Sequence, residues 1–165
     1  MKHRSRTSLP AATVLVAAQV ADFDRYATQA EALFAQDRAG EGEAAALRAF
    51  ELYGVGRRRD GEDDAWQLVE RSRLAAKYTR LVSLTGQHWM RAGKPEAARR
   101  AYERALELEP LAEEIYRSLM LVLVGLGQPA EALRVYRRCR DMLSVVLGVK
   151  PTAETERVHE ALRGG

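Results

Sequence analysis

The chain has 165 residues, a formal net charge of +3 and 47% hydrophobic residues. This composition excludes a disordered chain and fits one globular domain. The single cysteine, Cys139, excludes an internal disulfide, and no apolar run approaches the roughly 20 residues that a membrane span needs. The small positive charge gives little support to a nucleic-acid partner. Because the sequence offers no membrane span and no internal disulfide, we expect a cytoplasmic protein.

The first 20 residues admit two interpretations. Three basic residues precede an apolar stretch from Leu9 to Val20, as in a secretory signal. That stretch is short and is interrupted by Thr13 and Gln19, which argues against a signal. The run Val14–Val16 favours an extended, β-like segment instead. We predict that residues 1–20 form an extended segment or the remnant of a preceding domain, and that 21–163 form the domain proper.

Helical spacing of apolar residues, punctuated by glycine and proline, predicts about seven helices. Asp22 and Asp24 would cap the first helix, Gly40 and Gly42 would separate it from the second, and 54–64 would form a loop. The expected helical ranges are about 22–36, 43–52, 64–91, 95–108, 111–126, 129–147 and 152–162.

A pattern recurs after 34 residues, between positions 93 and 127, in the C-terminal half. The matched pairs are Gly93 and Gly127, Pro95 and Pro129, Ala98 and Ala132, Tyr102 and Tyr136, and Ala105 and Cys139. Such a period indicates stacked supersecondary units. Small residues let two helices approach closely, and the aromatic residue four positions on fills the gap to the next pair.

These positions resemble the tetratricopeptide repeat. The stretch 79–110 carries the family's signature residues, and the stretch from Glu113 departs from them at Met120 and Cys139. The signature residues are Gly86, Trp89, Gly93, Ala98, Tyr102, Ala105 and Pro110. The resemblance implies an all-α fold, an α-α superhelix of helical hairpins.

The stretch from Pro110 to Glu154 is similar, more narrowly, to the bacterial transcriptional activator domain. The segments PLAEEIYRSLM, GQPAEALRVYRRCR and LGVKPTAET carry this likeness. In that family the domain usually follows a winged-helix DNA-binding domain, as in antibiotic-pathway-type regulators, or belongs to large regulatory ATPases. The resemblance implies contacts with other proteins or self-association, with a homodimer as one form. DNA would be reached only indirectly, through a winged helix that is absent here.

No residues support catalysis. His3, His88 and His159 have no acid or cysteine at a recognisable spacing, and Cys139 lies on an apolar helix face. The segment Gly54–Gly56 is not followed by the lysine and hydroxyl of a phosphate loop. We therefore expect no enzyme activity, no cofactor and no metal.

Arg57, Arg58 and Arg59 form the densest basic run, in an expected loop. They would offer salt-sensitive, sequence-blind contacts to phosphate. A weak DNA-contacting domain is therefore one alternative function. A stand-alone tetratricopeptide adaptor or chaperone-like protein is another.

A protein-binding groove follows from the tetratricopeptide resemblance, because the first helices of each pair line the concave side. The positions carried over are Arg80, Ser83, Gln87, Met90, Arg91, Glu114, Arg117 and Leu121. The arginines would make the groove basic and suited to an acidic peptide, since guanidinium pairs with carboxylate through two hydrogen bonds. Alternatively, the chain's own helices fill this groove. The preferred function is a non-enzymatic interaction and oligomerisation module of a bacterial transcriptional regulator.

Overall fold

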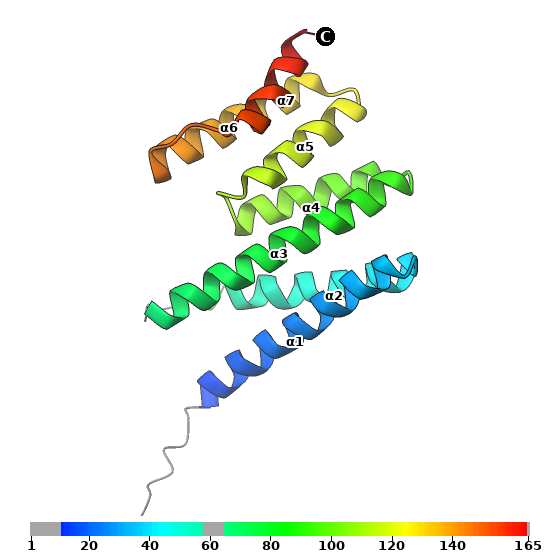
Figure 1. The fold of residues 1–165 in the computed structure, drawn as a ribbon, viewed down its shortest axis with the longest axis vertical. Helices are drawn as coiled ribbons and strands as arrows, with labels where there is room; N and C mark the ends of the chain where they lie inside the picture. Colours follow the sequence, from blue (N-terminus) through cyan, green and yellow to red (C-terminus); the bar gives the residue numbers. More distant parts are fainter. Residues whose placement is uncertain (1–10, 58–64, 165) are drawn as a thin grey trace, which may run out of the picture. The chain divides into compact units, whose positions relative to one another are not determined.

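The computed structural model describes residues 11–57 and 65–164, and these form seven helices with no strand among them. The chain divides into two compact units, Met1–Glu62 and Asp63–Gly165. The helices α1 and α2 belong to the first unit, and α3 to α7 belong to the second (Figure 1). The predicted all-α fold of tetratricopeptide-like hairpins is confirmed.

The first unit is a hairpin of α1 (Ala11–Ala35) and α2 (Ala39–Arg57). Alanines on both helices let the axes approach: Ala27, Ala30, Ala46 and Ala49 are all fully buried. At the open end, the rings of Phe23 and Tyr53 lie 5.4 Å apart at 44°. Aromatic pairs in this tilted arrangement add to the stability that burial alone gives.

The prediction of an extended segment is wrong for residues 11–20, which belong to α1. Asp22 and Asp24 consequently lie inside the helix and do not cap it. Alanine, the best helix former, recurs at 11, 12, 17, 18 and 21 and outweighs the small helix cost of the valines. The first ten residues lie outside the described part of the chain.

The turn between α1 and α2 is made by Asp37, which takes the left-handed conformation with φ of 59°. The N–H of Arg38 donates to the carbonyl of Leu33 at 2.9 Å, and that of Asp37 to Phe34 at 3.2 Å. These bonds satisfy the last carbonyls of α1. The predicted separators, Gly40 and Gly42, instead lie within α2.

The second unit contains two hairpins built on the same plan. They are α3 (Ala65–Arg91) with α4 (Pro95–Leu108), and α5 (Glu113–Gly125) with α6 (Pro129–Leu147). Gly93 and Gly127 have φ of 71° and 74°, and the residue after each donates across the turn at 2.8 Å. The proline that follows opens the next helix at a position where its missing N–H is harmless. The helix α7 (Ala153–Gly164) ends the unit.

Contacts between successive helices stack these hairpins: α4 packs on α5, α3 also reaches α5, and α7 lies against α5 and α6. The two matched alanines, Ala98 and Ala132, are fully buried, as the repeat pattern predicts. Tyr102 and Tyr116 fill the space between elements, and the Tyr116 hydroxyl donates to the carbonyl of Pro110 at 2.9 Å. The core therefore runs along the stacked helices and does not form a single centre.

Candidate protein-binding surface

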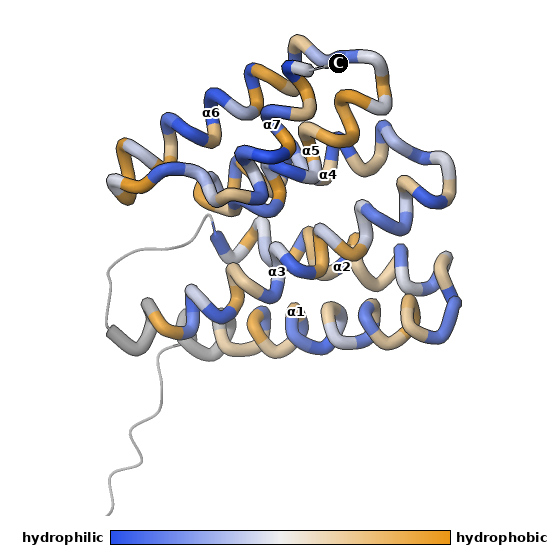
Figure 2. Tube along the Cα trace, turned by 45° about the horizontal axis from the view of Figure 1, so that its top comes forward, coloured by the Kyte–Doolittle hydropathy of each residue, from blue (hydrophilic) through white to orange (hydrophobic). Residues whose placement is uncertain are grey.

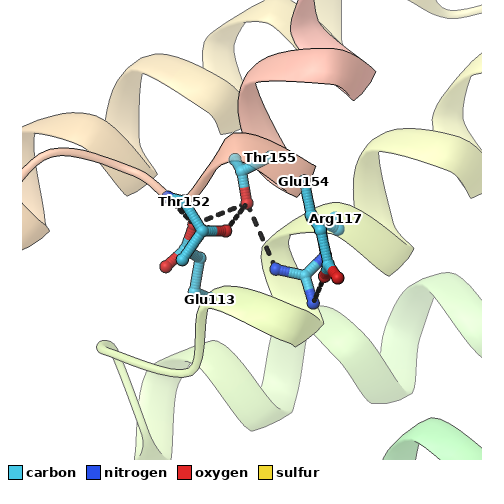
Figure 3. Close-up of polar contacts among 5 residues, drawn as sticks. All are labelled: Glu113, Arg117, Thr152, Glu154 and Thr155. Carbon is cyan, nitrogen blue, oxygen red and sulfur yellow. Dashed lines mark hydrogen bonds and ion pairs between the residues drawn. The ribbon is translucent and has the colours of Figure 1, made fainter.

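Glu113, the first residue of α5, holds the start of α7. Its Oε1 accepts three hydrogen bonds: 2.6 Å from the Thr152 N–H, 2.8 Å from the Thr152 hydroxyl and 2.6 Å from the Thr155 hydroxyl (Figure 3). A helix start carries unsatisfied N–H groups, and a carboxylate normally satisfies them from within the same helix. Here the carboxylate comes from 39 residues upstream, so the contact is tertiary.

The pKa of Glu113 reports the same contact. Partial burial acts to raise it, but the hydrogen bonds from Thr155 and Thr152 and the charge of Arg117 outweigh burial and lower the pKa below its ordinary value. These contacts therefore stabilise the ionised form of Glu113. We call Glu113, Arg117, Thr152, Glu154 and Thr155 the α7 clamp.

Arg117 completes the α7 clamp. Its guanidinium donates to the Thr155 hydroxyl at 3.2 Å and pairs with the Glu154 carboxylate at 3.2 Å (Figure 3). The Arg117 side chain is 21% exposed, whereas that of Glu154 is 64% exposed. The prediction that Arg117 lines an open groove is therefore wrong, because α7 supplies its carboxylate.

A second set of contacts fixes α7 to α6. The Tyr136 hydroxyl donates to Glu156 at 2.8 Å, and the ring of His159 stacks on that of Tyr136 with centroids 3.6 Å apart. Burial, with the hydrogen bond to Glu156, raises the pKa of Tyr136 to about 12. Tyr136 and the α7 clamp together make α7 an integral part of the second unit.

The remaining groove positions divide by exposure. Ser83 is only 4% exposed, so the prediction that it faces a ligand is wrong. Arg80, Gln87 and Arg91 on α3 are exposed, as expected. Of these, Arg91 makes no hydrogen bond or ion pair with any residue that the structure describes.

Apolar side chains also reach the surface of this face. Leu121 is 57% exposed, Val124 39% and Met90 38%. By the 34-residue repeat, Met90 is equivalent to Val124 and Gln87 to Leu121, so these residues occupy matching positions on α3 and α5. We call Gln87, Met90, Arg91, Leu121 and Val124 the α3–α5 face. Sequence reasoning missed Val124, although its match to Met90 was available.

The first residue of the basic run, Arg57, does not lie in the expected loop. Arg57 is the last residue of α2 and is half-buried, where a positive charge suits the helix C-terminus. Arg58 and Arg59 lie outside the described residues.

The cysteine and the two described histidines lie apart from one another in the part of the chain that the structure describes. Cys139 is fully buried, and burial raises the pKa of its thiol to about 12, which leaves it unreactive. In the described ranges, no three His, Cys, Asp or Glu side chains lie close enough together to hold a metal ion. His88 and His159 lie on different helices, α3 and α7.

A family model matches residues 19–163, and it describes the bacterial transcriptional activator domain. The chain belongs to this family. The match spans both compact units, including α1 and α2, where the sequence shows no clear repeat. The family is one of regulatory helical domains related to transcription activation.

No curated protein matches the sequence of this bacterial transcriptional activator domain. None of its described helices is both long and apolar enough to cross a membrane.

Proposed function

We propose that this domain is a non-enzymatic, cytoplasmic protein-interaction module of a bacterial transcriptional regulator, and that it binds its partner through the α3–α5 face. A separate winged-helix domain would contact DNA, so that this domain acts on transcription by what it binds.

The observation that carries the proposal is the exposure of Leu121 at 57% in the middle of α5. The neighbouring Met120 and Val122 are 0% and 3% exposed. Leu121 therefore points away from the core that they form. An aliphatic side chain held outward on a rigid helix, with others at equivalent positions, is a common anchor for a partner.

The charges narrow the kind of partner. Arg117 pairs with Glu154, so Arg91 is the unpaired positive group of the α3–α5 face. Exposed Glu114 lies near the N-terminal end of α5. An amphipathic partner helix with an apolar stripe and an acid positioned to meet Arg91 suits this pattern better than a uniformly acidic peptide.

A tethering experiment tests the proposal. The domain is fused to a DNA-binding domain of known operator, and transcription of a reporter gene is measured in a bacterial host. Leu121→Asp should reduce activation several-fold, because it places a charge at the centre of the face. Leu47→Asp is the matched control, since Leu47 is 47% exposed on α2.

Both variants must keep the thermal unfolding midpoint of the parent. If the fusion never activates, or if Leu121→Asp and Leu47→Asp behave alike, the α3–α5 face is not the binding surface.

A further inference from the structure

The helix α7 is held on α5 and α6 mainly by polar side chains. It has 12 residues and buries one of them, Thr155, whereas α5 has 13 residues and buries six. Val158 and Leu162, which follow Thr155 at helical spacing, are only half-buried. Figure 2 accordingly shows α7 mostly in hydrophilic colours, whereas hydrophobic residues prevail in α5. Apolar burial therefore contributes little to the attachment of α7.

The polar contacts of α7 are open to solvent. Glu154, which pairs with Arg117, has a side chain that is 64% exposed. The side chain of Glu156, which accepts from Tyr136, is 38% exposed. Water can replace either carboxylate, so contacts of this kind stabilise a fold only weakly. Because the link of residues 148–152 joins α6 to α7, α7 can separate from α5 while α6 stays in place.

The start of α7 covers one end of the row of side chains that continues the α3–α5 face. Arg117, Leu121 and Val124 follow one another at spacings of four and three residues, so they lie along one side of α5. Leu121 and Val124 are 57% and 39% exposed. The Arg117 side chain is only 21% exposed, and it contacts Glu154 and Thr155 of α7. A partner helix that follows this side of α5 past Leu121 therefore meets α7 at Arg117.

The first turn of α7 shows which groups this part of α5 accepts. The hydroxyls of Thr152 and Thr155 donate to the Glu113 carboxylate (Figure 3). The Glu154 carboxylate pairs with the Arg117 guanidinium. Another helix that begins with hydroxyl and acidic side chains offers the same groups to Glu113 and Arg117. Such a helix can take the place of α7 without leaving either side chain of α5 unpaired.

We propose that α7 is an autoinhibitory helix, which competes with the partner of the α3–α5 face for Arg117 and Glu113. This inference rests on the proposed function, because it concerns the partner of the same face and adds a second acid to that partner. One acid of the partner helix meets Arg91, and another replaces Glu154 on Arg117. A bound partner then stabilises the form in which α7 is displaced, because only that form offers Arg117.

A peptide with the sequence of residues 149–163 tests the exchange directly, because it carries the first turn of α7. The peptide is labelled with a fluorophore, and its binding to the full chain is measured by fluorescence anisotropy. In the parent chain the resident α7 is tethered beside its site, so the free peptide competes poorly. Glu154→Ala removes the ion pair that holds α7 and should tighten peptide binding roughly fivefold or more.

Arg117→Ala distinguishes a loosened α7 from an intact site. This variant deletes the same ion pair from the other side, so α7 is loosened as in Glu154→Ala, but the peptide loses the guanidinium that it needs. Peptide binding should therefore be no tighter than in the parent chain. Glu160→Ala is the matched control, because Glu160 is an exposed acid of α7 beyond its first turn. Amide hydrogen exchange in α7 should rise in Glu154→Ala and Arg117→Ala and stay unchanged in Glu160→Ala.

The reporter fusion measures the consequence for the partner. Glu154→Ala should raise activation above that of the parent fusion, and Arg117→Ala should lower it. The inference is overturned if the peptide binds these two variants alike, or if exchange in α7 does not rise in Glu154→Ala. It is also overturned if Leu121→Asp reduces activation while Glu154→Ala leaves it at the parent level, and in that case the proposed function stands. A fusion that activates in no form overturns both proposals.

Discussion

Gly86 on α3 lies directly against the phenol of Tyr102 on α4: a Cβ added at position 86 would lie 2.2 Å from the Tyr102 hydroxyl oxygen. No side chain fits at this distance. The glycine lets the two helices of the hairpin close over the aromatic ring, and both residues belong to the repeat signature.

Gly86→Ala should destabilise the domain by about 1–3 kcal/mol, because the buried ring of Tyr102 must shift to make room. Gly125→Ala on α5 is the control, since nothing lies within 4 Å of its added Cβ. Chemical denaturation measures both variants. Equal effects would show that the Gly86–Tyr102 contact does not determine the helix spacing.

The turn residues predict opposite effects for two substitutions. Asp37→Gly should stabilise the first unit by about 1 kcal/mol, because glycine adopts a φ of 59° without the strain of a side chain. Gly127→Ala should destabilise the second unit by a similar amount at its φ of 74°. Thermal unfolding of each variant checks the signs, and a stabilising Gly127→Ala would contradict this account.

The α7 clamp predicts a dependence on acid pH. Glu113 has a lowered pKa in the folded chain, so its contribution to stability is complete above the unfolded value of 4.5 and is lost as the pH falls through the folded value. Glu113→Gln should cost about 1–2 kcal/mol near neutral pH, because the bonds to Thr152 and Thr155 lose their charge.

Amide hydrogen exchange in α7 is the measurement for Glu113→Gln. Protection of α7 should fall in the variant near neutral pH and should match the parent once the pH lies well below 4.5. A constant difference at all pH values would mean that the carboxylate charge plays no part.

Through Tyr136, we expect the stability of the folded chain to fall as the pH rises into the alkaline range. Its pKa rises from 10.0 to about 12 on folding, so its contribution is complete below pH 10 and is lost as the pH rises through about 12. Tyr136→Phe removes the hydroxyl that donates to Glu156. Ultraviolet titration of the parent minus the variant should show one tyrosine ionising near 12. A step near 10 would show that neither the burial of Tyr136 nor its bond to Glu156 persists in solution.

Sequence alone predicts where α4 and α6 begin, because the glycine of each turn and the proline two residues later mark the start of the second helix of each hairpin. Sequence alone fails at the first hairpin because glycine does not mark the turn there. Asp37 makes the same turn without glycine, and the conspicuous Gly42 lies within a helix, where its added Cβ would lie 2.9 Å from the Phe34 ring. A glycine in this chain can therefore mark a close contact within a helix hairpin as well as a turn.

The candidate site was predicted less well than the fold. Repeat register predicts that Gln87 and Arg91 lie on the exposed side of α3, and both are exposed there; their part in binding stays a prediction. It could not show that α7 returns to α5 and supplies Glu154 to Arg117, since that contact joins residues 37 positions apart (117 and 154). The same contact decides which arginines remain for a partner.

The stacking of the second unit has a kinetic consequence. Each of its helices packs against elements one or two places along the chain, from α3 with α4 to α6 with α7. Low contact order of this kind favours fast folding, since no long loop must close before a contact forms. Unfolding would then proceed from the ends of the stack, as in other linear repeat arrays. The Glu113 carboxylate, which joins the last helix to the one two places before it, would set the order in which α7 leaves.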